Sequence, residues 1–262
     1  MKLNADIFIP VRLSSQRLPA KHLRLINGEP ALLKLIRRLE KSKKIRKIIV
    51  CTTTDNSDDP LIEILEKESI LYFRGDKNDI ITRFLNASKK FGTDLIIDVE
   101  GDKIYTDPLF VDTVVDELQD PNVDFVIGSD SYKEFNEYNN FVSGFIPAGI
   151  KRTALEKLCT IKKSENTETG YREFFTKTKI FNCKYLVPEN FKNNSSDIRL
   201  TLDYKEDLQL ANKIFCELGD NFSSNDVLEL LERKPSLIEI TKPLIKKWNK
   251  HYHNNLTKLD LK

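Results

Sequence analysis

The sequence is poor in cysteine and has no long hydrophobic run. Its four cysteines form no C-x-x-C pair and have no histidine cluster beside them, so their spacing argues against a disulfide framework and against a zinc site. We expect these thiols to be reduced and buried, as in a cytoplasmic protein: Cys51, Cys159, Cys183 and Cys216. No segment approaches the ~20 apolar residues that a membrane helix needs, and we expect no secretory signal at the N-terminus.

Net charge is also nearly absent. Lysine and arginine number 42 against 40 aspartates and glutamates, which gives a formal net charge of +2. This balance argues against bulk attraction to nucleic acid or to a membrane surface, so any strongly basic site must be local. Hydrophobic residues make up 40% and charged residues 31% of the chain, a composition typical of a soluble globular protein.

The sequence shows no internal repeat and no long linker, so we expect residues 1–262 to form a single domain. Short apolar runs at 45–51, 70–73 and 95–99 alternate with helical periodicities in the first hundred residues. This alternation predicts an α/β fold with a mostly parallel, Rossmann-like sheet and helices on both faces. Later segments predict a strand at 124–128, a loop over 129–140, helices near Arg152 and over 169–176, and a basic tail over 241–262 whose two nearby histidines lie at the surface.

Neither of the standard nucleotide-binding loops, G-x-x-x-x-G-K-[ST] and G-x-G-x-x-G, occurs in the chain. A polar loop instead follows the first apolar run, Ile7 to Val11, and carries Arg12, Ser15, Arg17 and Lys21. Arginine offers forked donors and lysine a compact charge, so this loop is a candidate cradle for polyphosphate at the carboxyl end of a strand. A solvated basic surface loop is the alternative.

The loop closely resembles the signature I-P-A-R-x-x-S-x-R-L-P-G-K of the bacterial cytidylyltransferases that make CMP-activated acidic sugars. The match runs from Ile9 to Lys21, with Ala20 in place of the usual glycine. The chain is most similar to the spore-coat-polysaccharide branch of that family. The resemblance implies a single nucleotide-diphospho-sugar transferase domain and assigns Arg12, Ser15, Arg17 and Lys21 to the nucleotide phosphates.

Two acidic motifs follow in the order that this family has. The segment 99–108 is similar to G-D-C-P-L-I-D-P, although Lys103 to Tyr105 depart from it, and 197–208 is similar to R-L-T-V-D-T-x-E-D-L. The resemblance implies that Asp102 and Asp203 hold Mg²⁺, which takes one or two carboxylates, phosphate oxygens and waters. A turn residue at Asp102 and a helix cap at Asp203 are the alternatives, and we interpret Asp107 as the cap of the next helix.

Two further segments carry weaker resemblance. The family pattern F-R-G-x-x-x-D-V-x-x-R matches this chain at Arg74, Asp79 and Arg83, and it assigns these residues to nucleotide binding or site architecture. The simple alternative is an i,i+4 helix pair between Asp79 and Arg83.

The acceptor motif P-D-G-x-D-V-E matches only at Gly144, and non-acidic residues stand where acids are expected: Ser143, Ile146 and Ala148. We expect this change to make the pocket less hostile to an anionic acceptor. The resemblance assigns about 130–193 to acceptor binding or dimerisation, with the aromatics of 169–176 either at an interface or in the core.

The resemblance therefore implies an enzyme that transfers CMP from CTP to a small acidic or phosphorylated acceptor and releases pyrophosphate. Its cofactor would be Mg²⁺, and the enzyme would be a homodimer. Its catalytic residues would be Arg12, Lys21, Asp102 and Asp203. The products would serve capsule, lipopolysaccharide, flagellar or spore-coat glycans. Two alternatives stay open: a nucleotide-sugar-dependent glycosyltransferase, for which the expected D-x-D pair is missing around Asp102, and a non-catalytic nucleotide-binding subunit.

Overall fold

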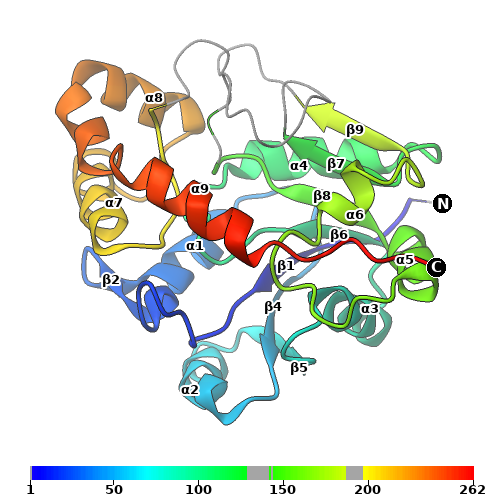
Figure 1. Cartoon of the computed structure of the whole chain (residues 1–262). Coiled ribbons are helices and arrows are strands. Elements are labelled where there is room, and N and C mark those ends of the chain that lie inside the picture. Colours follow the sequence, from blue (N-terminus) through cyan, green and yellow to red (C-terminus); the bar gives the residue numbers. More distant parts are fainter. Residues whose placement is uncertain (1, 129–141, 143, 187–196) are drawn as a thin grey trace.

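A seven-stranded sheet forms the centre of the molecule. The computed structural model describes residues 2–128, 142, 144–186 and 197–262. The strands lie in the order β5-β4-β1-β6-β8-β7-β9. In chain order they are β1 (Ala5–Pro10), β4 (Ile48–Thr53), β5 (Leu71–Gly75), β6 (Leu95–Asp98), β7 (Phe125–Gly128), β8 (Ala148–Lys151) and β9 (Cys183–Leu186), and Figure 1 shows them within a shell of helices.

Most of the sheet is parallel, as predicted. Strands β5, β4, β1 and β6 are parallel neighbours, with Ile9 opposite Val50, and β7 is parallel to β9. Strand β8 alone runs antiparallel to its neighbours β6 and β7 within the described residues. The sequence predicts no strand ahead of the helix near Arg152, so β8 is a strand that the sequence analysis missed. The short strand packs closely because Gly149 has no side chain: a Cβ there would lie 2.4 Å from Val114 and 2.7 Å from Leu118.

Helices cover both faces of the sheet, as expected for this class. Along β1 the side chains alternate, so Ile7 and Ile9 pack into one apolar cluster and Phe8 into the other. The first cluster includes residues of α1 (Ala31–Leu39), α2 (Asp59–Lys67) and α4 (Pro108–Leu118). The second includes residues of α3 (Ile80–Phe91), α5 (Arg152–Ile161) and α6 (Glu173–Thr176).

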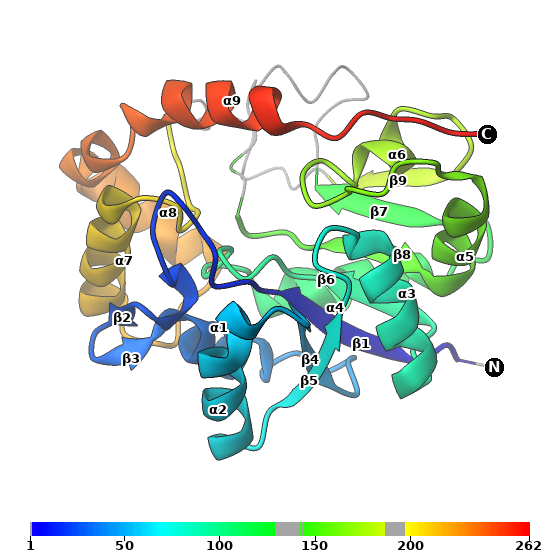
Figure 2. The ribbon, with the colours of Figure 1, turned by 60° about the horizontal axis from the view of Figure 1, so that its bottom comes forward.

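A third apolar cluster lies beside the sheet and supports one wall of the site. It joins α7 (Lys205–Leu218) and α8 (Ser224–Arg233) to the short 3₁₀ segment Pro235–Ile240 and to the small hairpin of β2 (Leu25–Ile26) and β3 (Glu29–Pro30). Figure 2 shows this group on the opposite side of the molecule from α3, α5 and α6. None of the described helices is long and apolar enough to span a membrane.

Three expectations need correction in the second half of the chain. The helix expected over 169–176 is confined to α6, and its aromatics Tyr171, Phe174 and Phe175 are buried in the core. The segment before Asp203, which the sequence predicts to be a short strand ahead of a helix, is irregular. The supposed basic tail contains the helix α9 (Leu244–Asn255), which crosses the front of the molecule in Figure 1. The loop expected over 129–140, Ser143 and part of the 130–193 segment lie outside the described residues.

Candidate active site

One cavity of about 660 Å³ contains most of the residues that the motifs singled out. It opens where β1 and β6 end, at Pro10 and Asp98, which is the edge at which parallel α/β sheets bind ligands. Most of its lining comes from four segments: the loop after β1, the loop after β6, residues 168–173 and α9. The start of α3, the end of β7 and residues 144–147 complete it.

The loop after β1 is anchored at its start and in its middle. The amide of Leu13 donates to Asp58 Oδ1 at 2.7 Å, and the buried side chain of Leu18 fixes the middle of the loop. Ala20 then takes a left-handed conformation with φ 50° and leads into the 3₁₀ turn Lys21–Leu23. Glycine adopts such a conformation easily, which explains why the family signature has glycine at this position.

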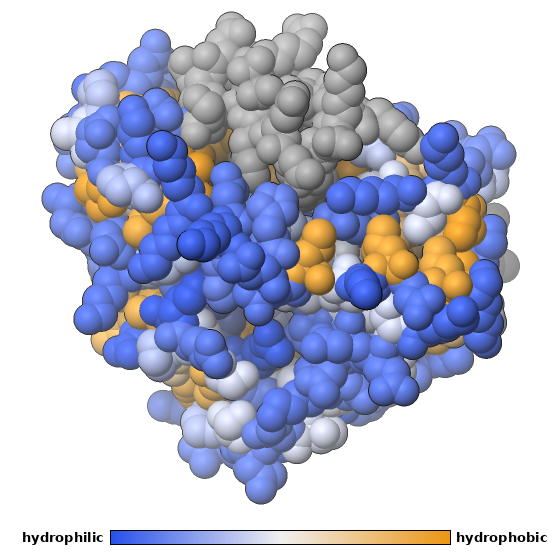
Figure 3. Space-filling view, in the orientation of Figure 1, coloured by the Kyte–Doolittle hydropathy of each residue, from blue (hydrophilic) through white to orange (hydrophobic). Residues whose placement is uncertain are grey.

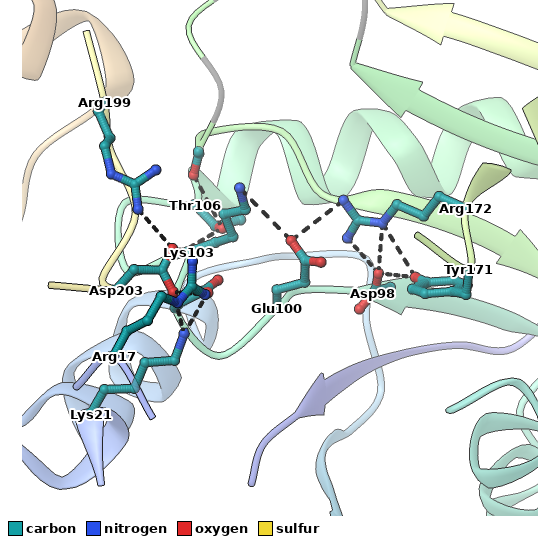
Figure 4. A network of polar contacts seen from close by, with 12 residues as sticks. Arg17, Lys21, Asp98, Glu100, Lys103, Thr106, Tyr171, Arg172, Arg199 and Asp203 are labelled. Carbon is teal, nitrogen blue, oxygen red and sulfur yellow. Dashed lines mark hydrogen bonds and ion pairs between the residues drawn. The ribbon is translucent and has the colours of Figure 1, made fainter. Parts of the chain in front are cut away.

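Lys21 joins the two predicted metal carboxylates. Its Nζ lies 2.7 Å from Asp102 Oδ2 and 2.9 Å from Asp203 Oδ1, although the three residues are far apart in the chain (Figure 4). Loss of solvent alone would raise the carboxyl pKa values of both aspartates, but Lys21 holds both below their usual range. The same two carboxylates outweigh the burial of Lys21 and raise its pKa.

Asp203 is surrounded by cations. Arg17 Nη2 and Arg199 Nη2 each lie 2.7 Å from one of its oxygens, in addition to Lys21. The helix-cap alternative for Asp203 does not describe this side chain, because Asp207 accepts from the amides at the start of α7. Asp107, by contrast, caps α4 as interpreted and accepts from Leu109 N at 3.0 Å.

The two carboxylates form a donor set suited to Mg²⁺. Asp102 Oδ1 is buried and has no hydrogen-bond partner, so it is available as a ligand atom. The described residues contain no group of three or more histidine, cysteine, aspartate or glutamate side chains placed so that they could hold a metal ion. Two carboxylates without a third protein ligand match Mg²⁺ held together with phosphate oxygens and waters.

A second polar network lies beside the first and was missed by the sequence analysis. Arg172 Nη2 lies 2.5 Å from Asp98 Oδ2, and its Nη1 lies 3.5 Å from Glu100 Oε2 (Figure 4). The Tyr171 hydroxyl also donates to Asp98. Loss of solvent, together with the charges of Asp102 and Asp98, raises the carboxyl pKa of Glu100. The sequence offered a reason to consider Asp98 a site residue, because it ends the strand just before the Gly-Asp motif. It offered no such reason for Arg172.

Arg12 and Arg83 meet on one carboxylate. Arg12 Nη1 lies 3.5 Å from Glu168 Oε2, and the fully buried Arg83 places Nη2 2.8 Å from Glu168 Oε1. Arg83 also donates to the Asp76 carbonyl at 2.7 Å, so its guanidinium does not form the simple i,i+4 pair. Ser15, Arg12 and Arg83 all line the cavity.

Arg74 and Asp79 do not line the cavity. Arg74 donates to the backbone carbonyls of Thr53 and Asp55, at 2.8 and 2.9 Å. Asp79 caps α3 and pairs with Lys162 Nζ at 2.5 Å. Their assignment to the nucleotide stays a prediction. In the altered acceptor motif, Ile146 lines the cavity, whereas Ala148 is buried in β8 opposite Asp98.

Helix α9 supplies the remaining wall. Trp248, His251, Tyr252 and Asn255 line the cavity from this helix, so the expectation of two surface histidines holds for His253 but not for His251. The signal was present in the sequence, since these residues recur at i, i+3, i+4 and i+7.

Comparison with known proteins agrees with this arrangement. The sequence model of one family, described as cytidylyltransferase, matches residues 7–232. The chain belongs to the cytidylyltransferase family. Among relatives of this cytidylyltransferase, the spore coat polysaccharide biosynthesis protein SpsF of Bacillus subtilis is 26% identical over 246 residues, which cover 89% of this chain and 96% of that protein.

Two more relatives extend the comparison. The 3-deoxy-manno-octulosonate cytidylyltransferase 2 of Hydrogenovibrio crunogenus is 29% identical over 138 residues, or 50% of this chain and 54% of that protein. The structure of a cytidylyltransferase from Leptospira borgpetersenii is similar with a TM-score of 0.78 and 27% identity, covering 91% of this chain and 97% of that one. The family, the enzyme class and the α/β fold expected from the motifs are thereby confirmed.

Proposed function

We propose that this cytidylyltransferase transfers CMP from CTP to an acidic sugar or similar small acceptor, with Mg²⁺ as cofactor, for synthesis of a surface glycan. The contact of Lys21 with both Asp102 and Asp203 is the observation that carries the proposal, because it brings all three family motifs to one point. The names of the relatives point to sugar acids and to polysaccharide synthesis. The glycosyltransferase alternative lacks comparable support.

In the proposed reaction an acceptor oxygen forms a bond to the α-phosphorus of CTP. The bond from that phosphorus to the bridging oxygen breaks, pyrophosphate leaves, and the acceptor proton passes to solvent. Catalysis of this kind depends mostly on positioning and on neutralising charge. Arg12, Arg17 and Lys21 would bind the triphosphate and balance the charge that develops on pyrophosphate.

Asp102 and Asp203 would hold Mg²⁺, which supplies further neutralisation of the phosphate charge when bound. Lys21 donates to both carboxylates and would also donate to phosphate oxygens of CTP. Asp203 would stay in place through Arg199, which is itself fixed by Asp207 at 3.1 Å. A homodimer and a cytoplasmic location remain predictions.

The test is pyrophosphate release with Mg²⁺, each of the four nucleoside triphosphates and a panel of sugar acids and phosphorylated sugars. We expect release with CTP, and a loss of at least about 100-fold in Asp102→Ala and Asp203→Ala, because each removes a metal ligand that supports several kcal/mol of charge stabilisation. Asp226→Ala, an exposed cap of α8, is the matched control and should keep full activity. Release by both site variants at the control rate would contradict the proposal.

A further inference from the structure

Helix α9 presents two distinct faces. The four residues Trp248, His251, Tyr252 and Asn255, here called the α9 stripe, line the cavity along one side of the helix. The other side carries exposed lysines at 246 and 250, and the face of the molecule around α9 is mostly hydrophilic in Figure 3. Lys247 lies between the two faces, with its ammonium 4.8 Å from the centre of the Tyr204 ring. A helix that turns its aromatic residues toward a cavity and its lysines toward water is built as a wall of that cavity.

The segment that follows α9 holds the helix in place. Leu256 packs against Gly170, where a Cβ would lie only 2.3 Å from Leu256 Cδ1. The amide of Thr257 donates to the Thr169 carbonyl at 3.0 Å, and that of Lys262 donates to the Ile161 carbonyl at 2.8 Å. Figures 1 and 2 both show α9 and this segment running across the molecule from the α7 side to α5. The α9 stripe is therefore fixed by main-chain contacts at its C-terminal end.

The stripe also connects the two polar networks of the cavity. At one end Arg199, which holds Asp203, lies 5.5 Å from the centre of the Trp248 ring. Further along, the Tyr252 hydroxyl contacts Glu173 Oε1 at 3.5 Å, next to Arg172 in the chain. In the proposed reaction an acceptor oxygen reaches the α-phosphate of CTP near Lys21, Asp102 and Asp203, and the cavity beside the α9 stripe has room for the rest of the acceptor.

The chemistry of the stripe fits a sugar. The rings of Trp248 and Tyr252 stack on one another with centroids 5.2 Å apart and an interplanar angle of 17°, so the pair forms one apolar block in the wall of the cavity. His251 and Asn255 add groups that both donate and accept hydrogen bonds. A pyranose ring offers an apolar C–H face and a rim of hydroxyls, and sites of this mixed character bind such ligands.

We propose that the α9 stripe is the acceptor-binding wall of this enzyme and selects the sugar that receives CMP. The proposal rests on the proposed transfer of CMP, and it assigns a role to residues beyond 7–232, the part of the chain that the family pattern matches. His251 and Tyr252 are its specificity-determining residues. Trp248 supports the wall and also packs on the arginine that positions Asp203.

The test compares steady-state kinetics of His251→Ala, Tyr252→Ala and Tyr252→Phe with two controls on the outer side of the helix, Lys250→Ala and Asn254→Ala. We expect KM for the accepted sugar to rise about tenfold in the two alanine variants of the stripe, which corresponds to about 1.4 kcal/mol of lost binding. KM for CTP should stay within about twofold. Tyr252→Phe keeps the ring and should retain most of the acceptor affinity.

A binding measurement gives a second readout. Trp248 is the single tryptophan of the chain, so intrinsic fluorescence reports on the α9 stripe directly. With wild-type protein and CTP present, 3-deoxy-manno-octulosonate or the sugar acid that supports turnover should change this fluorescence in a saturable manner. The change should need higher sugar concentrations in His251→Ala and not in Lys250→Ala.

Three results would overturn the inference. In the first, the wild type turns over and the stripe variants have the same KM values as the outer controls. This result would overturn the inference and leave the proposed function intact. Equal rises in KM for CTP and for the sugar, together with a lowered melting temperature, would show that α9 has a purely structural role. No pyrophosphate release by the wild type with any acceptor would overturn the proposed function and this inference together.

Discussion

Single residues near the cavity perform opposing electrostatic tasks. Lys21 offsets the repulsion of two carboxylates that lie close enough to share its ammonium group. Two such carboxylates without a cation between them would raise each other's pKa. His22, the next residue, has the opposite character, because burial and the positive charge of Lys21 lower its pKa to about 4. At neutral pH, Lys21 is therefore charged and the imidazole ring of His22 beside it is neutral.

The neutral His22 predicts a pH-dependent stability. Between a folded-state pKa of about 4 and an unfolded value of about 6.5, only the unfolded chain binds the proton, so the free energy of unfolding falls as pH falls through this window. The slope from this group is at most about 1.4 kcal/mol per pH unit. His22→Asn, whose amide can replace the 3.2 Å contact of Nδ1 with the Gly101 carbonyl, should remove that part of the slope.

Urea unfolding at pH 7 and pH 5 provides the measurement, and the difference between wild type and His22→Asn is the quantity to compare. The exposed His253→Asn variant is the matched control and should keep the wild-type slope. Identical slopes for wild type and His22→Asn would show that His22 is not held neutral by the fold.

At the scale of elements, the start of α3 shows how a family position can be used for stability. Asp79 accepts from Thr82 N at 3.1 Å and from Thr167 Oγ1 at 2.8 Å, and it pairs with Lys162. Burial opposes its charge, but Lys162 and the two threonines outweigh burial and lower the pKa of Asp79. One side chain therefore ties α3 to the segment that follows α5.

We expect Asp79→Ala to lower the free energy of unfolding by about 3 kcal/mol, because it removes a cap and leaves Lys162 without its carboxylate. KM for CTP should change by less than about twofold. Ser223→Ala, which removes only the cap of α8, is the control and should cost about 1 kcal/mol. Chemical denaturation and CTP kinetics on the same preparations separate the effects. A large rise in KM with little loss of stability would instead support the predicted nucleotide role of Asp79.

The elements that the sequence could predict are those with local signals. Strand β1 and its loop were predictable because an apolar run and a dense motif adjoin, and Asp102 and Asp203 each lie inside a motif. Strand β8 was not predictable, because its four residues include a glycine and are too few to show a hydrophobic periodicity. Its conformation depends on contacts with α4. Arg172 was missed for a similar reason: its partners Asp98 and Glu100 are more than seventy positions away.

The whole molecule is closed by its C-terminal segment. Gly170 and Gly28 have nearly equal φ values, +81° and +83°, but a Cβ at Gly170 meets Leu256 whereas a Cβ at Gly28 meets nothing within 4 Å. We expect Gly28→Ala to cost about 1 kcal/mol from backbone strain alone. Gly170→Ala should cost about 1 kcal/mol more, because Leu256 must move out of its contact.

Thermal unfolding measures the difference between these two variants, and hydrogen exchange locates it. The amides of Thr257 and Lys262 should exchange faster in Gly170→Ala and not in Gly28→Ala, since both amides belong to the segment that Leu256 anchors. Equal exchange in both variants would mean that Leu256 does not anchor the C-terminal segment.

The attachment of α9 has a consequence for protein synthesis. The first motif precedes Tyr252 and the residues that fix it along the chain, so it leaves the ribosome before them. Domains begin to fold from the N-terminus during translation, so the sheet and the phosphate loop can form while the cavity still lacks one wall. The cavity is complete only after α9 and the residues that hold it at Thr169 and Gly170 have all been made.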